Sequence, residues 1–250
     1  IQKIEKQGVD KRKGKKGSPS IALLVKQWCG AIFRYAVVTL RAEYDPAAPI
    51  QGAITRPRVR HHPHLEGPEL SGFMRALNAY EERGMRQTII ALRLLLLTFV
   101  RNGELRLAIW DEFDLEKRIW TVPADRMKAG VEHRVPLSVQ AVAVLKKAHV
   151  IDGSSLVFAA PRGGQLSDMA LTQAMRRMGL KCVPHGFRST FRDWCGERTN
   201  YPRELAEQAL AHVLSNKVEA AYRRGDALEK RRTMMQVWAD YAAASVEPKP

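Results

Sequence analysis

The chain reads PHGFRSTFRDWCGERTNYPRELAEQALAHVLSNKVEAAYRRG from Pro184 to Gly225, and the rest of the sequence is best interpreted from this stretch outward. Its candidate chemical groups are two imidazoles, one of its guanidiniums and one of its phenols, which belong to His185, His212, Arg188 and Tyr222. Only the imidazoles are common metal ligands, so the set suits a metal poorly. It suits attack on a phosphate, because a guanidinium binds two phosphate oxygens at once and a phenol can be a nucleophile.

A tyrosine needs cationic help to act as a nucleophile at neutral pH. A phenol titrates near 10, so roughly 0.1% of it is ionised at pH 7, a deficit of about 4 kcal/mol. Arg188 follows His185 by three residues, so a helix that begins near Gly186 places both in its first turn, where unpaired N–H groups favour an anion. Each preorganised donor aimed at the developing charge is worth about 3 to 4 kcal/mol. Tyr222 is therefore the expected covalent nucleophile.

A purely structural interpretation accounts for part of the same stretch. Apolar residues recur at helical spacing and predict a core face on this helix, formed by Phe187, Phe191, Trp194 and Cys195. Arg188 falls off that face. Tyr222 follows Val218 and Ala221 at the same spacing, so by itself it also fits a half-buried aromatic. Taken singly, each of these residues is more often structural than catalytic, and the joint pattern changes that balance.

The joint pattern resembles the C-terminal signature of tyrosine recombinases, specifically the integrases of prophages and genomic islands. The motifs that carry it are His185-Gly-Phe-Arg188, Leu210-Ala-His212, and Tyr222 ten residues later. Upstream, Thr98-Phe-Val-Arg101-Asn-Gly-Glu104-Leu105 is similar to the family box with the first catalytic arginine. Arg126-Met-Lys128-Ala-Gly130, followed by His133-Arg-Val-Pro-Leu137, is similar to the β-hairpin with the catalytic lysine.

The resemblance runs from about Ile21 to Ala244 and fills six family positions: Arg101, Lys128, His185, Arg188, His212 and Tyr222. It implies that Tyr222 attacks the scissile phosphate, forms a 3′-phosphotyrosine and frees a 5′ hydroxyl. Arg101, Arg188 and His212 would stabilise the phosphorane, His185 would assist proton transfer, and Lys128 would protonate the departing oxygen. No cofactor, metal or ATP is implied.

The implied fold is mainly α with a small antiparallel β-sheet (α+β), the tyrosine recombinase catalytic fold, preceded by part of a helical core-binding domain. The implied function is site-specific DNA recombination, the integration or excision of a prophage or genomic island. Double-stranded DNA attachment sites are the expected substrate, with a homotetramer on DNA and accessory DNA-bending and directionality proteins as further partners. Two alternatives stay open: a type IB topoisomerase that relaxes DNA, and a non-catalytic DNA-binding remnant of an integrase.

Composition agrees with a polyanionic partner. The chain has 250 residues, a formal net charge of +15 and 45% hydrophobic residues, enough for a sizeable core. Its three cysteines include no CxxC pair, which favours reduced thiols in a cytoplasm. The expected location is the bacterial cytoplasm, at the nucleoid. The longest apolar run, Ile89 to Val100, is too short to span a bilayer, so no membrane partner is expected.

The chain divides into four predicted parts. Residues 1–20 carry seven basic residues against two acids and predict a basic flexible tail. Residues 21–54 hold one long amphipathic helix, the C-terminal part of the DNA-clamp domain. Residues 55–66 predict an extended linker, whose Arg56, Arg58 and Arg60 are candidate phosphate contacts. Residues 67–250 form the predicted catalytic domain. The chain begins at Ile1 without a methionine, so we expect a fragment of a longer protein.

Local patterns predict the elements of the catalytic part. The three expected strands are Ile109 to Phe113, Arg118 to Val122 and Glu132 to Leu137, with Lys128 beside the second turn. Ser138 is expected to begin one helix and Ser167 to cap another from Asp168 to Met178, whose Arg176 and Arg177 are candidate DNA contacts. His61, His62 and His64 are interpreted as linker residues, because no acidic or cysteine ligand stands nearby.

Overall fold

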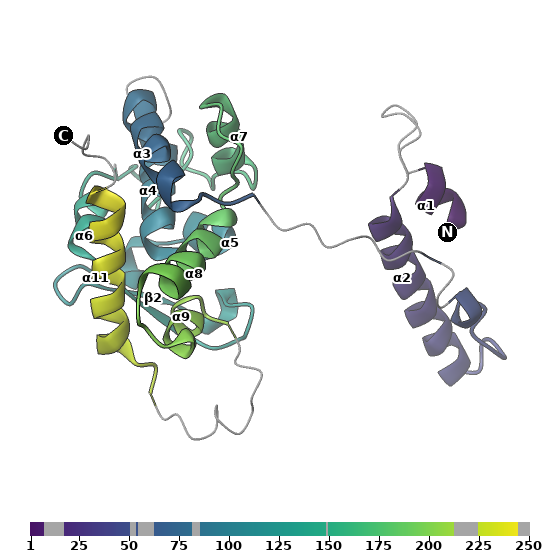
Figure 1. Cartoon of the computed structure of the whole chain (residues 1–250). Coiled ribbons are helices and arrows are strands. Elements are labelled where there is room, and N and C mark those ends of the chain that lie inside the picture. Colours follow the sequence, from purple (N-terminus) through teal and green to yellow (C-terminus); the bar gives the residue numbers. More distant parts are fainter. Residues whose placement is uncertain are drawn as a thin grey trace. The chain divides into compact units, whose positions relative to one another are not determined.

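The computed structural model describes residues 1–7, 18–50, 54, 63–81, 86–148, 150–212 and 225–244. These fall into two compact units, Ile1–His61 and His62–Pro250 (Figure 1). The boundary between the units falls inside the predicted linker 55–66. The fold class is as predicted: helices dominate, and one three-stranded antiparallel sheet is present.

The first unit is built on α2 (Pro19–Val38), with α1 (Gln2–Gln7) packed on it and a 3₁₀ turn at Ala48–Ile50. Ser18 precedes Pro19 at the start of α2, where proline's missing N–H costs no helical bond. The expectation of a tail over residues 1–20 is wrong for α1, which is tied to the next helix through the Ser18 N–H and the Ile4 carbonyl at 3.1 Å. Residues 8–17 lie outside the described part.

Helix α2 leaves large apolar side chains in solvent within its unit, among them Trp28, Ile32 and Tyr35, each more than 60% exposed. By length and composition alone α2 could also cross a membrane. It carries Lys26 and Arg34, however, and charges within a hydrocarbon core are costly. An amphipathic helix, as its apolar periodicity predicts, accounts for the same residues without a membrane.

The second unit is organised around α4 (Arg86–Thr98), which is buried at nearly every position because its sequence is apolar on all sides. It packs against α3 (Gly67–Glu81), α5 (Asn102–Arg106), α6 (Val139–Leu145) and α7 (Ala170–Arg177). Ser138 caps α6 as predicted, since its hydroxyl accepts a hydrogen bond from the Ala141 N–H at 3.1 Å. Helix α4 ends just before Arg101 and so delivers that residue to the surface of the core.

The sheet has the order β1 (Phe113–Asp114), β2 (Ile119–Val122), β3 (His133–Pro136), and both pairs are antiparallel. The second and third strands match the prediction, and Trp120 opposite Val135 fixes their register with both side chains buried. The first strand does not match. Trp110–Glu112 forms a 3₁₀ turn, because Ile109 pairs with Leu156 and the Trp110 N–H is bonded to Ser155.

Helix α7 begins later than expected. Ser167 does not cap it: the Ser167 carbonyl closes a turn with the Ala170 N–H, and Met169 occupies the cap position. Arg176 and Arg177 are exposed in its last turn, where positive charge also complements the helix dipole. Their proposed contact with DNA therefore has a structural alternative.

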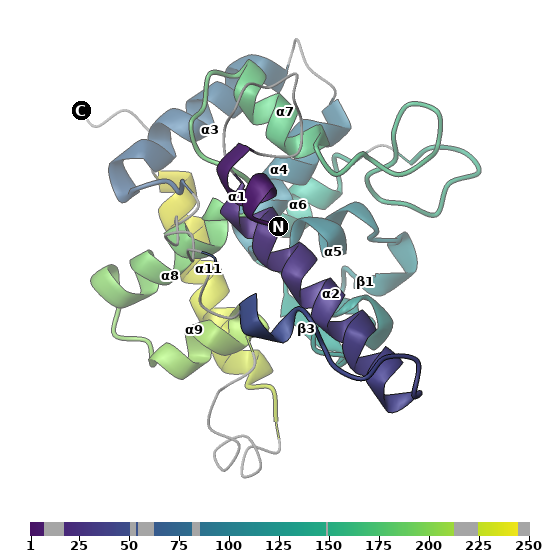
Figure 2. The same cartoon turned by 90° about the vertical axis from the view of Figure 1, so that its right-hand side faces the viewer.

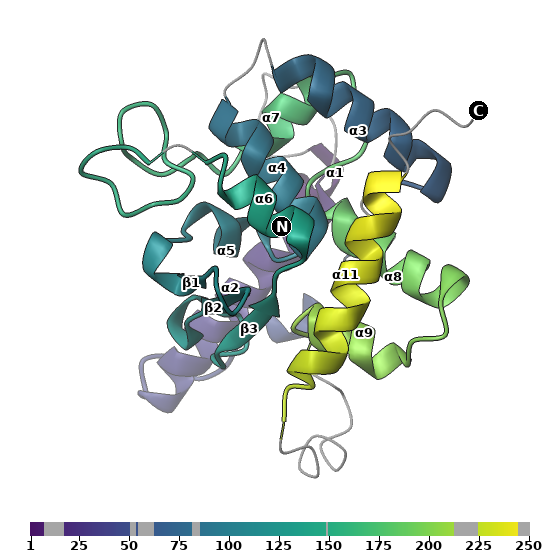
Figure 3. The same ribbon diagram turned by 90° about the vertical axis from the view of Figure 1, so that its left-hand side faces the viewer.

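Helices α8 (Gly186–Arg198), α9 (Arg203–Ala209) and α11 (Leu228–Ala244) complete the unit. Figures 2 and 3, from opposite sides, show α8 and α9 on one side of α11 and the sheet with α5 on the other. The predicted core face of α8 is buried, including Cys195. Phe191 stacks on Phe99 at 3.7 Å between ring centroids, and the Trp238 indole donates to Leu96 at 2.9 Å. Helix α11 thus packs within its own chain.

Candidate active site

Among the predicted site residues that the structure describes, Arg188 is the most enclosed, with only 6% of its surface exposed. It lies in the first turn of α8, whose apolar face holds that turn against the core. Its Nη1 donates to the Phe99 carbonyl at 2.7 Å and its Nη2 to the Leu210 carbonyl at 2.5 Å. Burial, followed by the charge of Arg101, lowers the pKa of Arg188 to about 10, so the guanidinium stays charged at neutral pH.

His212 lies between Arg188 and a carboxylate. Its Nε2 is 2.8 Å from Nη2 of Arg188, and its Nδ1 is 2.5 Å from Oε2 of Glu207. An arginine can only donate, so Nε2 accepts, and Nδ1 carries the proton that it donates to Glu207. Glu207 also pairs with Arg192 at 3.0 Å, so the carboxylate is held from two sides.

Arg101 reaches the same place from the other end of the core. Its Nη1 bonds Oε1 of Glu104 at 2.8 Å, and its Nη2 donates to the Ala211 carbonyl at 3.2 Å. Oε2 of Glu104 accepts from the Arg101 N–H at 2.7 Å and closes a capping box at the start of α5. Glu104, only 4% exposed, therefore supports Arg101 and the start of α5.

The C-terminal end of α9 is the common attachment point of these side chains. Successive carbonyls of Ala209, Leu210 and Ala211 accept from His133, Arg188 and Arg101 respectively. The last carbonyls of a helix have no partner inside it, and the helix dipole makes this end favourable for cations. Ala211 adopts φ +49, and this left-handed turn directs the next residue, His212, back onto Glu207.

His133, in β3, was quoted in the hairpin motif but given no role by sequence reasoning. Burial lowers its pKa to about 4, and the charges of Arg231, Arg188 and Arg101 act in the same direction against a hydrogen bond to Ala209 that raises it. The imidazole is therefore neutral at pH 7. Together with His212 it lines a cavity of about 190 Å³.

Lys128 lies in the turn between η4 (Ala124–Arg126) and β3 and is exposed. A bond between the Gly130 N–H and the Met127 carbonyl, at 2.9 Å, closes the turn, and Gly130 takes φ +64, which glycine adopts freely. Its neighbours Met127 and Ala129 line the same cavity as His212. The hairpin is therefore close to Arg101, Arg188 and His212, which we call the arginine cluster. A general acid on a mobile turn would have to lie near these residues.

His185 occupies the exposed N-terminal end of α8, one turn before the buried Arg188. Gly186, between them, lies under the backbone of residues 63 and 64: a Cβ at this position would be 2.3 Å from the Pro63 carbonyl oxygen. The Val183 N–H donates to the same oxygen at 3.2 Å, and the Leu65 N–H donates to the Thr190 hydroxyl at 3.0 Å. Residues 63–65, at the end of the predicted linker, are thus attached by hydrogen bonds to α8, which carries Arg188, and to the residue Val183 just before it.

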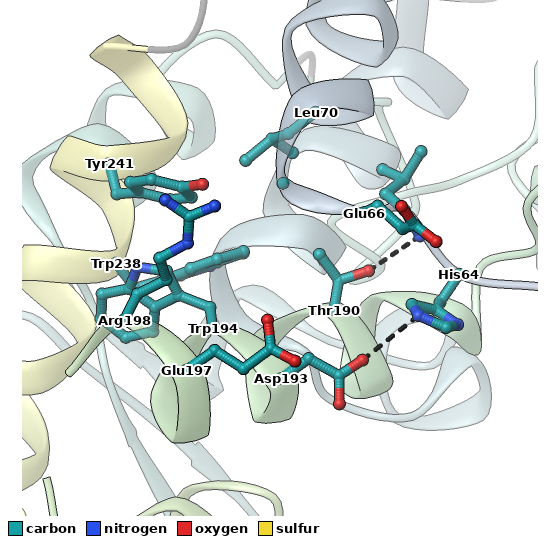
Figure 4. A pocket seen from close by; sticks show the side chains of 12 residues that line it. His64, Glu66, Leu70, Thr190, Asp193, Trp194, Glu197, Arg198, Trp238 and Tyr241 are labelled. Atoms are coloured by element: carbon teal, nitrogen blue, oxygen red, sulfur yellow. Dashed lines mark hydrogen bonds and ion pairs between the residues drawn. The ribbon is translucent and has the colours of Figure 1, made fainter. Parts of the chain in front are cut away.

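A larger hollow of about 350 Å³ lies beside this attachment (Figure 4). His64 and Asp193 pair across its rim at 3.2 Å, and Trp194, Trp238 and Tyr241 form an aromatic wall. His64 therefore does have an acidic neighbour, which is distant in sequence and could not be foreseen from local composition. None of the six predicted catalytic residues lines this hollow.

Four of the predicted residues lie outside the described part of the chain: Tyr222, Arg56, Arg58 and Arg60. Of the other catalytic candidates, the structure brings Arg101, Arg188 and His212 together and places Lys128 and His185 at exposed positions on adjoining elements. Sequence reasoning missed Glu207 and the role of His133. An acid five residues before a candidate histidine was the only available signal for Glu207.

The cluster has the chemistry of an anion site. Arg188 has five N–H donors, of which the described contacts engage three, and Arg101 adds a second guanidinium that is 25% exposed at its side chain. Paired guanidiniums held by backbone carbonyls can bind the non-bridging oxygens of a phosphodiester and stabilise further negative charge there. His212 supplies a proton-carrying group at the same place.

Comparison with known proteins agrees with this chemistry. A sequence model described as the phage integrase family matches residues 64–229, and one described as the phage integrase central domain matches residues 2–53. The chain is 38% identical to the integrase of Enterobacteria phage P4, over 90% of the chain and 55% of that protein. It is 33% identical to prophage integrase IntS of Escherichia coli strain K12, over 93% of the chain and 61% of that protein. The chain thus spans little more than half the length of these relatives.

Solved structures share the fold. A lambda integrase fragment, residues 75–356, in a dimer bound to a COC′ core site, matches with a TM-score of 0.59 and 21% identity over 78% of this chain and 73% of that chain. The integrase from mycobacterium phage Brujita matches with a TM-score of 0.56 and 18% identity over 92% of this chain and 78% of that chain.

Proposed function

This chain belongs to the phage integrase family of tyrosine recombinases, and from that membership we propose that it breaks and rejoins DNA at specific sites through a 3′-phosphotyrosine intermediate. Integration or excision of a prophage or genomic island is the corresponding biological reaction. The observation that carries the proposal is the convergence of Arg101, Arg188 and His212 on the C-terminal end of α9. These residues are up to 111 positions apart in sequence, and a phosphodiester is the ligand that their donors fit.

In this proposal the phenolate of Tyr222 attacks phosphorus while the 5′ oxygen leaves with a proton from Lys128. The energy of the broken phosphodiester is conserved in the new tyrosyl ester, so rejoining needs no ATP. Arg101 and Arg188 stabilise the charge on the non-bridging oxygens, and His212 hydrogen-bonds the same group. His185 assists proton transfer from the exposed end of α8.

The two units take separate roles. We propose that residues 67–250 form the catalytic domain, that residues 21–54 belong to a DNA-clamp domain, and that the linker of residues 55–66 follows the DNA backbone with Arg56, Arg58 and Arg60. Arg176 and Arg177 are proposed as further phosphate contacts. A lambda integrase structure is a tetramer bound to a Holliday junction, which supports a homotetramer on DNA for this chain. Accessory bending and directionality proteins and a place in the bacterial nucleoid complete the proposal.

A nicked suicide substrate tests the reaction. Cleavage releases a short strand that carries the free 5′ hydroxyl, and once this strand diffuses away the covalent adduct cannot be rejoined. Wild-type protein is expected to form an adduct that is lost on protease treatment and maps to Tyr222. Tyr222→Phe is expected to bind the same DNA without forming any adduct. An adduct of wild-type yield in Tyr222→Phe would reject Tyr222 as the nucleophile. Relaxation of plasmids at random sites, without exchange between two defined sites, would favour a topoisomerase instead.

Arg188→Lys separates catalysis from binding. Lysine retains the charge but not the planar fork that contacts Phe99, Leu210 and His212, so the cleavage rate should fall much more than the DNA affinity. Equal losses in rate and affinity would indicate a simple binding role for Arg188.

A further inference from the structure

Asp226 lies at the junction of the sheet with α11. The Arg134 side chain from β3 holds its carboxylate through two hydrogen bonds, Nε to Oδ2 at 3.0 Å and Nη2 to Oδ1 at 2.8 Å. Arg231 from α11 adds Nη2 to Oδ2 at 2.9 Å and Nε to the Asp226 carbonyl at 2.7 Å. Arg231 also donates to the Arg134 carbonyl at 2.7 Å, so the three residues close a ring.

One member of the ring is buried in the core, while Arg134 and Asp226 lie at its partly exposed edge. Arg231 is only 1% exposed and is among the largest fully buried side chains of the described residues. Burial by itself would raise the pKa of Asp226, but the hydrogen bond from Arg134 and the charges of Arg231 and Arg134 outweigh it and lower the pKa. The carboxylate is therefore ionised at neutral pH, and each bond in the ring is charge-assisted. A buried guanidinium with this many partners fixes one arrangement, because losing a partner would leave a charge uncompensated.

The ring adjoins the arginine cluster. Asp226 and Arg231 line the same cavity of about 190 Å³ as His133 and His212. His212, which also lines that cavity, is held by Arg188 and Glu207. His212 and Asp226 are therefore two fixed points of the chain that line the same cavity. Figure 3 shows β3 beside the start of α11.

Chain length then limits where the proposed nucleophile can act. Tyr222 precedes Asp226 by four residues. Each residue spans at most about 3.3–3.6 Å, so the Tyr222 Cα lies within about 14 Å of the Asp226 Cα in any conformation. Anchoring Asp226 turns this reach into a limit around one fixed point of the fold. Without the ring, the next fixed point along the chain is α11 itself, beginning at Leu228.

We propose that Arg134, Asp226 and Arg231 form a clasp that positions Tyr222 at the arginine cluster by anchoring the chain just beyond it. The three are positioning residues, because they act through the tyrosine and do not touch the reacting atoms. The inference rests on the proposed function, in which Tyr222 is the nucleophile.

The clasp predicts a loss that is specific to the tyrosine. Asp226→Asn keeps the shape of the side chain and removes its charge, and Arg134→Gln opens the ring at its more exposed member. Both variants are expected to form the covalent adduct about 10- to 100-fold more slowly, since misplacing a reacting group by about 1 Å costs rates of this order. DNA affinity is expected to stay at the wild-type value. Asp240→Asn and Arg232→Gln, on the same helix but outside the ring, are the matched controls and should keep the wild-type rate.

A small diffusible nucleophile distinguishes positioning from general damage. In Tyr222→Phe, hydrogen peroxide is supplied to attack phosphorus in place of the phenol while the 5′ oxygen departs. The double variant Tyr222→Phe/Asp226→Asn should cleave with peroxide as fast as Tyr222→Phe alone, because the clasp acts only through the tyrosine. Equal slowing of peroxide cleavage, or a wild-type adduct rate in both Asp226→Asn and Arg134→Gln, would overturn the clasp. Failure of the wild-type protein itself to form an adduct would instead reject the proposed function and, with it, the clasp.

Discussion

Nη2 of Arg188 lies 2.8 Å from Nε2 of His212, and this contact determines which ring nitrogen of His212 carries the proton. The arginine can only donate, so the proton resides on Nδ1 and faces Glu207 at 2.5 Å. Before DNA binds, Nε2 is occupied as an acceptor. To donate a hydrogen bond to a phosphate, His212 must exchange its arginine partner for the phosphate and gain a proton on Nε2, and the carboxylate of Glu207 stabilises the imidazolium that results.

Removing the Glu207 charge should therefore slow cleavage without weakening DNA binding. Glu207→Gln keeps an oxygen that can accept from Nδ1 but no longer compensates a positive imidazole. We expect the single-turnover cleavage rate to fall by about 10- to 100-fold, the order seen when an orienting partner of a functional histidine is removed. Glu204→Gln, one turn earlier on α9, is the control and should cleave at the wild-type rate. An unchanged rate in Glu207→Gln would show that the carboxylate only holds α9 in place.

The lowered pKa of His133 predicts how the free energy of unfolding depends on pH. Its pKa is about 4 in the folded protein against 6.5 for a free imidazole, so between these values the unfolded chain binds the extra proton. The free energy of unfolding should therefore fall as pH drops from 6.5 to 4, by about 3 kcal/mol for this residue alone. His133→Gln should show a shallower dependence than wild type over this window, measured by urea unfolding at a series of pH values. Parallel curves for the two proteins would contradict the buried neutral imidazole.

Ala211 is expected to respond favourably to loss of its methyl group. A non-glycine residue at φ +49 is strained by about 1 to 2 kcal/mol, and part of this is recovered by glycine after its larger entropy in the unfolded chain is counted. Ala211→Gly should raise the unfolding free energy by about 0.5 to 1 kcal/mol. Ala143→Gly, at an exposed position in α6, should lower it by about 1 kcal/mol. A loss of stability in both variants would mean that the left-handed turn carries no strain.

Much of this fold follows from local patterns. The apolar run through Ile89 to Val100 predicts a buried helix because no polar face is present, and α4 is that helix. Strands β2 and β3 follow from alternation around a glycine turn. The first strand fails because a stretch of extended residues does not specify its partner: Ile109 pairs with Leu156, 47 positions away, and not with the sheet.

The site is less accessible from sequence periodicity. Contacts from Arg188 to Phe99 and from Arg101 to Ala211 join residues separated by 89 and 110 positions, and no local rule predicts them. The family resemblance identified Arg101 and Arg188, but it did not identify the residues that hold the site in place. Glu207, His133 and the Arg134–Asp226–Arg231 ring are visible only when the chain is folded, because each acts by contacting a backbone or side-chain group of another element.

Gly186 gives the sharpest test of how the linker end is attached to the site. The glycine is needed for space and not for an unusual backbone angle, because a Cβ would meet the Pro63 oxygen at 2.3 Å and the His64 Cα at 2.9 Å. Backbone atoms cannot rotate away as a side chain does, so Gly186→Ala must move either residues 63–64 or the first turn of α8. We expect a loss of about 1 to 3 kcal/mol in unfolding free energy, as for other overpacked sites.

A shift of the first turn of α8 should also displace Arg188, which lies in that turn. Its hydrogen bonds to Phe99 and Leu210 are short and would be distorted. Adduct formation by Gly186→Ala on the suicide substrate should be slower than wild type at a temperature where both proteins are folded. Gly196→Ala is the matched control on the same helix, since nothing lies within 4 Å of its Cβ, and it should gain about 1 kcal/mol of stability from helix propensity. If Gly186→Ala matches Gly196→Ala in stability and in cleavage, residues 63–64 are not fastened to α8 as the structure has them.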